Sequence, residues 1–339
     1  MKKTTYLVLF ASLIILFGAC DPETDDPNNP NPTTPTTHVY IAANDSYFIG
    51  SGPAVYWKDG VKTVLSTNEN GTQATSIFVD DNNNIYVGGE NNDKPVVWKN
   101  GVEQILSTDY GCVNGIIVKN NIVYAVGTIR NDAILWRNGI AETIATGNIY
   151  NNYNAIPTNI FIQGNDIYIS GYSGNYEQAG TAWIWENGTM TNLSENKAQA
   201  NDLFVSGNNV YVVGIEKYVA PNITSHKAVL WTNGIAQDLN IGGLHSDAYA
   251  ICRSNDTNYI ACTGYYGSAY NGYYKGCLWK NNFSSLYNCT SLLDLFVHGS
   301  DLYILGYDGD FEKHPVLFKN GVKSVISYST SWPTAIFVK

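Results

Sequence analysis

Basic residues are scarce in this sequence. Its 339 residues include 19 Lys and Arg against 29 Asp and Glu. The first 19 residues hold two of the lysines and no acid, so the remainder carries a net charge near −12. Contacts to a nucleic-acid backbone need clustered Lys and Arg. We therefore expect no nucleic-acid partner.

The N-terminus lacks an apolar run long enough to span a membrane. The stretch from Tyr6 to Phe17 is apolar but too short for a spanning helix. It follows Lys2 and Lys3 and precedes two small residues, an order that is typical of a secretory signal. We predict a lipoprotein signal peptide over residues 1–19.

A cysteine stands directly behind this signal. The residues before Cys20 read Leu-Phe-Gly-Ala and resemble a bacterial lipobox. The resemblance implies cleavage before Cys20 and a lipid anchor, including palmitate, on that residue. The alternative is an ordinary secretory signal followed by a chance cysteine. The acids of residues 21–26 resemble the export signals of surface lipoproteins in Bacteroidetes-type bacteria, which implies an outer-membrane lipoprotein that is surface-exposed or periplasmic.

Large apolar side chains are missing from residues 21–37. This stretch consists mostly of Pro, Thr, Asn and acid. Such a composition cannot form a core. We predict that residues 20–37 are a lipidated cysteine and a disordered tether.

An aromatic phrase recurs in the rest of the chain. The motif consists of apolar residues, an aromatic residue, a polar residue and then Asn-Gly or a close variant. It recurs every 38 to 49 residues. The aromatic residues are Trp57, Trp98, Trp136, Trp185, Trp231, Trp279 and Phe318. A period of this size is typical of propellers and other repeat arrays.

Each repeat orders its β-rich runs in the same way, and we name them strands A to D. In the second repeat they read IFVDD, NIYVGG, VWKNG and VEQIL. Asn-Gly between two such runs is a strong hairpin signal, because both central residues of a type I′ turn need positive φ. The phrase therefore predicts the C–D hairpin of a four-stranded antiparallel sheet.

Strand C is apolar on both faces. In residues 228–231, Val229 and Trp231 point one way while Ala228 and Leu230 point the other. Neighbouring sheets must cover both faces. We predict an all-β fold over residues 38–339, a seven-bladed β-propeller of four-stranded antiparallel blades. An open solenoid is the alternative, but it needs polar capping repeats, which we do not find.

The two ends of the repeat region complement one another. The first repeat has strands B, C and D but no A, and residues 333–339 read as a spare strand A. We predict that this C-terminal strand pairs into the first blade and closes the ring.

Two known repeat types are similar to this one. AVLWTNGIAQDL resembles the HAF-type extracellular repeats of bacteria, and IFVDDNNNIYVGG resembles the first hairpin of NHL-type propellers. The NHL resemblance implies that strand A is innermost. Neither resemblance implies an activity.

Tyrosines are concentrated in the connections on one face of the predicted propeller. Antiparallel order places the A–B and C–D turns on one face, the turn face, and the longer B–C and D–A connections on the other, the loop face. Tyrosine offers a stiff apolar surface with a polar tip, which suits sugar rings and protein hot spots. The alternative is that these side chains merely fill gaps between loops. Our ligand-binding candidates on the loop face are Tyr172, Tyr176, Tyr218, Tyr265, Tyr266, Tyr270, Tyr273, Tyr274 and Trp332.

Signals for catalysis and for metals are thin. Asp308, Asp310 and Glu312 alternate like oxygen ligands of calcium but lack the other positions of a calcium loop, so a solvated acidic loop is the alternative. Near the three loop-face histidines we find no nucleophile at a recognisable spacing. We expect no catalytic residue and no cofactor.

Blade six contains four cysteines, one on each strand. They are Cys252, Cys262, Cys277 and Cys289, and an exported protein permits disulfides. We predict one or two disulfides among them, and Cys112 as a free thiol.

Three functions fit these observations. The first is a membrane-anchored extracytoplasmic binding module, monomeric, that presents its tyrosine-rich loop face to a glycan or protein. The second is a propeller hydrolase or lyase acting on polysaccharide, and the third is a scaffold subunit of an envelope complex. We favour the binding module, and we consider an enzyme less well supported.

Overall fold

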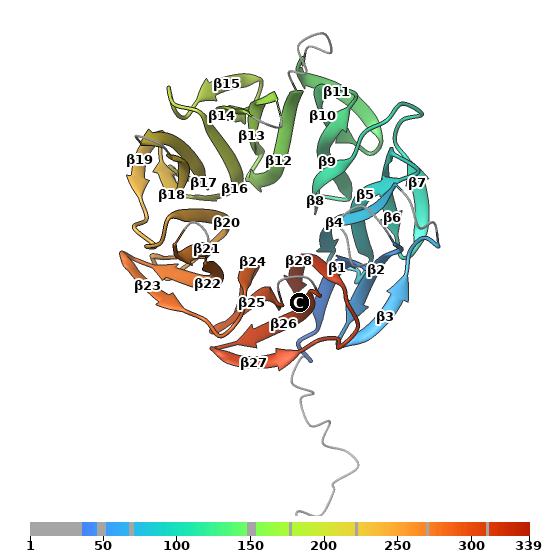
Figure 1. Cartoon of the computed structure of the whole chain (residues 1–339). Helices are drawn as coiled ribbons and strands as arrows, with labels where there is room; N and C mark the ends of the chain where they lie inside the picture. The colour runs from blue at the N-terminus through green and yellow to red at the C-terminus, as the bar shows by residue number, and fades with distance from the viewer. Residues whose placement is uncertain are drawn as a thin grey trace, which may run out of the picture. The chain divides into compact units, whose positions relative to one another are not determined.

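Seven four-stranded antiparallel sheets form a ring in the unit Thr37–Lys339 (Figure 1). The computed structural model describes residues 36–45, 52–67, 71–147, 154–175, 178–220, 223–268, 271–309 and 312–339, with the side chains of 175, 178–179, 218–220 and 223–224 left out. The all-β, seven-bladed prediction is confirmed. The described part of the chain has no helix that is long and apolar enough to cross a membrane.

The strands of each blade run from the axis to the rim in the order A, B, C, D (Figure 1). Blade one is β28 (Trp332–Val338), β1 (Val39–Asn44), β2 (Ala54–Lys58) and β3 (Val61–Val64). Blade two is β4 (Thr72–Val79), β5 (Ile85–Asn91), β6 (Lys94–Lys99) and β7 (Val102–Ile105). Blade three is β8 (Val113–Lys119), β9 (Ile122–Ile129), β10 (Asp132–Arg137) and β11 (Ile140–Ala145). Blade four is β12 (Asn154–Gln163), β13 (Asp166–Asn175), β14 (Gln178–Glu186) and β15 (Thr189–Asn192). Blade five is β16 (Ala198–Ser206), β17 (Asn209–Ala220), β18 (Ile223–Thr232) and β19 (Ile235–Asp238). Blade six is β20 (His245–Ser254), β21 (Thr257–Gly267), β22 (Gly272–Lys280) and β23 (Phe283–Leu286). Blade seven is β24 (Ser291–His298), β25 (Asp301–Asp308), β26 (His314–Lys319) and β27 (Val322–Val325).

The C-terminal strand closes the ring as predicted. β28 pairs antiparallel with β1, with Ile41 opposite Ile336 and Val39 opposite Val338. Beyond these pairs, His38 and Lys339 exchange backbone hydrogen bonds of 2.6 and 3.0 Å. Blade one is therefore built from both ends of the repeat region.

The C–D turns have the positive φ angles that the sequence predicted. In the second blade Asn100 has φ 50° and Gly101 has φ 81°. The Asn side chain also does something that the sequence did not reveal, because Oδ1 of Asn100 accepts a hydrogen bond of 2.8 Å from the backbone N–H of Ile85 at the start of β5. Equivalent bonds from the N–H of the first or second residue of strand B reach Asp59, Asn138, Asn187, Asn233, Asn281 and Asn320. The recurring Asn or Asp thus forms the C–D turn and also binds the start of strand B, next to the A–B turn.

Polar side chains join the innermost strands of successive blades. Each inner strand has a β-bulge, and in blade two it lies between Ala74 and Ser76. Thr75, within this bulge, donates a hydrogen bond to the carbonyl of Val113 in blade three. The same bond to the next blade is made by Asn114, Thr158, Asn201 and Thr334. These bonds satisfy carbonyl groups that the bulge leaves outside the strand ladder.

Candidate functional site

Four of the predicted tyrosines lie together on the β21–β22 hairpin of blade six. Tyr265 is opposite Tyr274, and Tyr266 is opposite Tyr273. Their ring centroids are 4.9 and 6.1 Å apart, respectively. Tyr273 and Tyr274 are 59% and 51% exposed, whereas the other two are largely covered. The hairpin thus offers two aromatic side chains to solvent.

The two covered tyrosines have structural partners. The hydroxyl of Tyr265 accepts a hydrogen bond of 3.1 Å from the N–H of Gly272, and that of Tyr266 donates one of 2.9 Å to the carbonyl of Ile241. The first bond lies within the hairpin, and the second fixes the hairpin against the segment between blades five and six. Tyr273 and Tyr274 are therefore the better candidates for ligand contact.

Two histidines lie beside this hairpin. His226 and His245 stack with their ring centroids 5.1 Å apart, and His245 lies 5.9 Å from the ring of Tyr265. Nε2 of His226 is 3.1 Å from Oδ1 of Asp247. Burial lowers the pKa of His245 most, and the neighbouring His226 lowers it further, whereas Asp247 raises it. His245 is thus held in its neutral form at neutral pH.

Hydrogen bonding determines which nitrogen of His245 carries the proton. The hydroxyl of Ser225 donates to the carbonyl of Leu244. Its oxygen is 2.9 Å from Nδ1 of His245, so it accepts the proton on that nitrogen. Nε2 of His245 then remains as a hydrogen-bond acceptor.

A cavity of about 360 Å³ opens at the same place. It lies between blades five and six, and residues 240–246, Lys227 and Asp238 line it together with both histidines. Lys227 lies 3.5 Å from both Asp238 and Glu216, which balances its charge. We refer to this cavity, the stacked histidines and the two exposed tyrosines as the His–Tyr site.

The other predicted aromatic residues lie elsewhere. Tyr172 is on β13 of blade four, and Trp332 packs 5.6 Å from the ring of Tyr307 in a cluster that also holds the ammonium of Lys313. Tyr176 and Tyr270 lie outside the described residues, as does the side chain of Tyr218. Among the described side chains, the predicted tyrosines that lie together are those of blade six.

Seven further tyrosine positions belong to the frame. Every strand B has a tyrosine at the same position, and in blade two Lys99 lies 5.2 Å from the ring centre of Tyr86. The repeated residues are Tyr40, Tyr86, Tyr124, Tyr168, Tyr211, Tyr259 and Tyr303. Much of the tyrosine content of the chain thus serves packing between blades.

The acidic segment of blade seven has other partners. Asp308 forms an ion pair with Lys323, and Glu312 lies 3.9 Å from Nε2 of His314. Asp310 is outside the described residues. Among the side chains that the structure describes, no three His, Cys, Asp or Glu residues lie close enough to hold a metal ion.

The cysteines of blade six divide between its two faces. Cys262 and Cys277 are opposite one another in the β21–β22 ladder and pack toward blade five. Cys252 and Cys289 pack toward blade seven. All four, like the partly covered Cys112, are free thiols in the structure. The predicted disulfides are therefore not formed here, and only the pair Cys262 and Cys277 has the required register.

Two carboxyl groups that the sequence analysis missed face the axial cavity. This cavity, of about 460 Å³, is lined by the innermost strands, including Asp202 of blade five and Asp294 of blade seven. Burial raises the pKa of Asp202 to about 6 and that of Asp294 to about 7, against the lowering effect of backbone hydrogen bonds. The bonds come from the N–H groups of Ile251 and Ile336 in the next blades, at 2.7 and 2.8 Å. Both carboxyl groups therefore connect blades.

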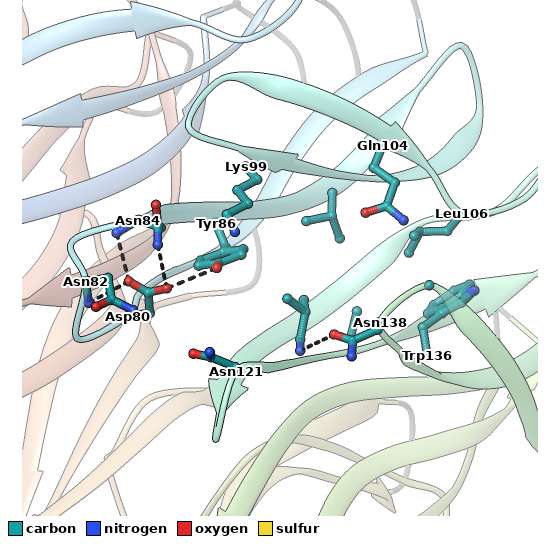
Figure 2. A pocket seen from close by; sticks show the side chains of 14 residues that line it. Asp80, Asn82, Asn84, Tyr86, Lys99, Gln104, Leu106, Asn121, Trp136 and Asn138 are labelled. Carbon is teal, nitrogen blue, oxygen red and sulfur yellow. Dashed lines mark hydrogen bonds between the residues drawn. The ribbon is translucent and has the colours of Figure 1, made fainter.

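A third cavity lies on the turn face between blades two and three (Figure 2). It has a volume of about 370 Å³. Val97, Ala125 and Trp136 form a buried floor, and Lys99 and Gln104 stand at its exposed rim. Figure 2 shows Lys99 and Gln104 on one side and Asn121 and Asn138 on the other. The sequence analysis did not anticipate a site on this face.

Comparisons with known proteins show the fold and nothing finer. The chain matches no protein-family model and no curated protein sequence. Among solved structures, a puromycin-hydrolysing peptidase of Mycobacterium tuberculosis shares 11% identity over 85% of this chain and 51% of its own, with a TM-score of 0.55. A protein from Lactobacillus plantarum shares 12% identity over 89% of this chain and 99% of its own, with a TM-score of 0.51. The extracellular domain of the B. thetaiotaomicron protein BT4673 reaches a TM-score of 0.45 at 12% identity over 86% of this chain, which spans only 38% of that domain.

Proposed function

We propose that this protein is an extracytoplasmic binding module, anchored by lipid on Cys20, whose His–Tyr site binds a glycan or a protein ligand. The observation that supports this function is the exposure of Tyr273 and Tyr274 on a hairpin that Tyr265 braces internally and Tyr266 bonds to the segment between blades five and six. Exposed aromatic rings on a rigid support bind with little loss of conformational entropy.

The neighbouring groups supply polar contacts. His245 offers Nε2 as an acceptor, and the cavity beside it is bordered by backbone at Gly242 and Gly243. Both glycines have positive φ, 86° and 89°. At Gly243 a Cβ would come within 2.4 Å of the carbonyl oxygen of Tyr265, so only glycine lets the segment pass this close to the hairpin. An aromatic platform beside such a pocket suits a sugar ring or a side chain of a protein partner.

The binding function is tested on the purified full chain. A glycan array and an envelope pull-down are run with the wild type and with the double variant Tyr273→Ala, Tyr274→Ala. We expect the double variant to lose at least tenfold in affinity for whatever the wild type captures. Tyr110→Ala and Tyr328→Ala remove exposed tyrosines, 55% and 84% accessible, elsewhere in the protein and should have no effect. Equal capture by the double variant and the wild type would exclude the His–Tyr site.

The lipid anchor has its own test. Mass spectrometry of the chain from a bacterial envelope should find the N-terminus at Cys20 with its lipid, and Cys20→Ser should release the protein from membranes. Intact residues 1–19 in the envelope form would contradict the proposed processing.

A polysaccharide hydrolase or lyase is the second candidate. It is supported by the two carboxyl groups of raised pKa that face the axial cavity, because a general acid must keep its proton near neutral pH. Under this function, cleavage of acidic or neutral polysaccharides by the wild type should be lost in Asp294→Asn. Absence of reducing-end release by the wild type on a broad polysaccharide panel would exclude it.

A further inference from the structure

The cavity between blades two and three exists because one repeated position has lost its bulk. In every blade, the residue after the repeated tyrosine of strand B lies opposite the repeated aromatic residue of strand C. In the other blades this residue is Ile41, Val87, Ile169, Val212, Ile260 and Ile304. In blade three it is Ala125, opposite Trp136, and Ala125 lies on the cavity floor.

The missing side chain faces the neighbouring blade. Ala125 and Trp136 belong to the apolar cluster that joins blades two and three, together with Tyr86 and Val97. An isoleucine in place of Ala125 would extend three more carbon atoms into that interface. Ala125 and Trp136 line this cavity together with the exposed side chains of Lys99 and Gln104, so the cavity extends from the buried interface to the turn face. Figure 2 shows the labelled side chains of its lining.

The lining combines an apolar floor with carboxamides. Five carboxamide side chains border the cavity, those of Asn82, Asn84, Gln104, Asn121 and Asn138, and Lys99 is the only cation. A carboxamide can both donate and accept hydrogen bonds, as a sugar hydroxyl can. Asn84 already donates to Asp80 and accepts from Asn100, and Oδ1 of Asn138 accepts from Val123. The recognition of a ligand would therefore use Asn82, Gln104, Asn121 and Nδ2 of Asn138.

The one acid of the cavity is already engaged. Asp80 accepts hydrogen bonds from the N–H groups of Asn82 and Asn84, from Nδ2 of Asn84 and from the hydroxyl of Tyr86. Burial would raise the pKa of Asp80, but these bonds outweigh it and lower the pKa. Its charge therefore holds the A–B turn of blade two and is not available to a cationic ligand.

We propose that this cavity binds a single pyranose ring. The volume of about 370 Å³ lies within the range of small-ligand sites. The C–H face of the ring would lie on Val97, Ala125 and Leu106, with its hydroxyls toward Gln104 and the surrounding asparagines. This site lies on the turn face, so it is independent of the His–Tyr site on the loop face and goes beyond the proposed function.

The experiment uses isothermal titration of the full chain with methyl glycosides of glucose, galactose, mannose, N-acetylglucosamine and glucuronic acid. We expect at least one of them to bind the wild type with a Kd in the micromolar to millimolar range. Ala125→Ile, which restores the residue found in four other blades, should weaken that binding at least tenfold without lowering the melting temperature.

Matched controls separate the cavity from general effects. Val87→Ile adds one methylene at the equivalent position of blade two, outside the cavity lining, and should bind like the wild type. Gln104→Ala should weaken binding by about tenfold, which corresponds to roughly 1.4 kcal/mol for one lost hydrogen-bonding group. The equivalent Gln237→Ala in blade five should not.

Two results would overturn the proposal. One is a wild type that binds none of the five glycosides at 20 mM or so, a concentration well above the expected Kd. The other is an Ala125→Ile variant that folds and binds a glycoside as well as the wild type. Neither result bears on the His–Tyr site, whose test uses Tyr273 and Tyr274.

Discussion

The junction between blades two and three and the junction between blades five and six create their cavities in opposite ways. At the junction between blades two and three, the repeated position of strand B holds a smaller side chain, because Ala125 stands where the other blades have Ile or Val. At the second, the frame is complete, with Val212 and Ile260 at that position, and long loop-face segments add His226, His245 and the tyrosine hairpin.

The two junctions also differ near the axis. At the second residue of the bulge, blade two has Ser76, whose hydroxyl lacks a hydrogen-bond partner among the described residues, while blade five has Asp202, which bonds to Ile251 of the next blade. In a repeat protein, a blade that departs from the repeated sequence marks a candidate binding site. The departure can replace a large side chain by a small one or add polar and aromatic side chains. Four substitutions test this comparison.

The largest effect should come from the closing strand, on which both junctions depend. Ile336 of β28 is 5% exposed and packs between blades one and seven. Ile336→Ala should lower the free energy of unfolding by about 2–4 kcal/mol, through lost transfer energy and the cavity left behind. Chemical denaturation followed by tryptophan fluorescence measures it. Ile105→Ala, on a residue 51% exposed, should cost less than about 0.5 kcal/mol, and equal costs would show that the ring is not sealed at this strand.

The second effect separates Asp202 from Ser76. Because burial raises the pKa of Asp202 to about 6 from its ordinary 3.8, the folded state binds the proton more tightly than the unfolded chain does. Stability from this group is therefore greatest below pH 4 and falls as the pH rises through 6, by roughly 1–3 kcal/mol.

This pH dependence has a clear readout. The free energy of unfolding, measured from pH 4 to pH 8, should decline less steeply in Asp202→Asn than in the wild type. Ser76→Ala should leave the slope unchanged. Part of the slope will persist in both variants, because Asp294 has its pKa raised to about 7 in the same direction. An identical slope in Asp202→Asn and wild type would contradict the assignment.

The third effect tests the missing volume. Ala125→Ile should raise the free energy of unfolding by about 1–2 kcal/mol, since each buried methylene contributes about 0.8 kcal/mol and some of this is lost to repacking. Thermal unfolding compares it with Val87→Ile, which should change stability by less. A destabilised Ala125→Ile would mean that the floor cannot accept the side chain and that the cavity is not simply an absent isoleucine.

The smallest effect lies at the stacked histidines. Burial and the neighbouring His226 lower the pKa of His245. His226→Gln removes the second of these causes, so the pKa of His245 should rise. NMR titration of the imidazole signals measures the change, and His298→Gln, on a distant histidine of blade seven, serves as the control. A pKa of His245 that does not move would show that burial alone lowers it.

The fold was readable from the sequence because its signals are local and repeated. The Asn-Gly turns, the two-sided apolar strand C and the spare strand at residues 333–339 each predict a contact that β28, β1 and the C–D hairpins make. The sequence also placed four tyrosines in one connection of blade six, and the structure brings them together on the β21–β22 hairpin.

Other parts of the sites were not readable. Asp202 and Asp294 are the single acidic residues of their inner strands, and they lie at a bulge from which each carboxyl group bonds to the next blade. Ala125 resembles a minor variation until the seven blades are superimposed. The stacking of His226 on His245 joins residues of two blades, which no spacing along the chain predicts.

The sequence by itself determined that seven equivalent sheets cover one another and that the ring closes on its own end. These properties follow from short-range turn chemistry and from strands too apolar to stand alone. The tertiary structure alone decided where the ring departs from its symmetry. It determines which interface between blades contains a cavity, which carboxyl groups are buried away from water and which tyrosines remain exposed. Packing, burial and hydrogen bonding between blades set those properties, and each depends on residues that the ring brings together from different blades or from the connections between them.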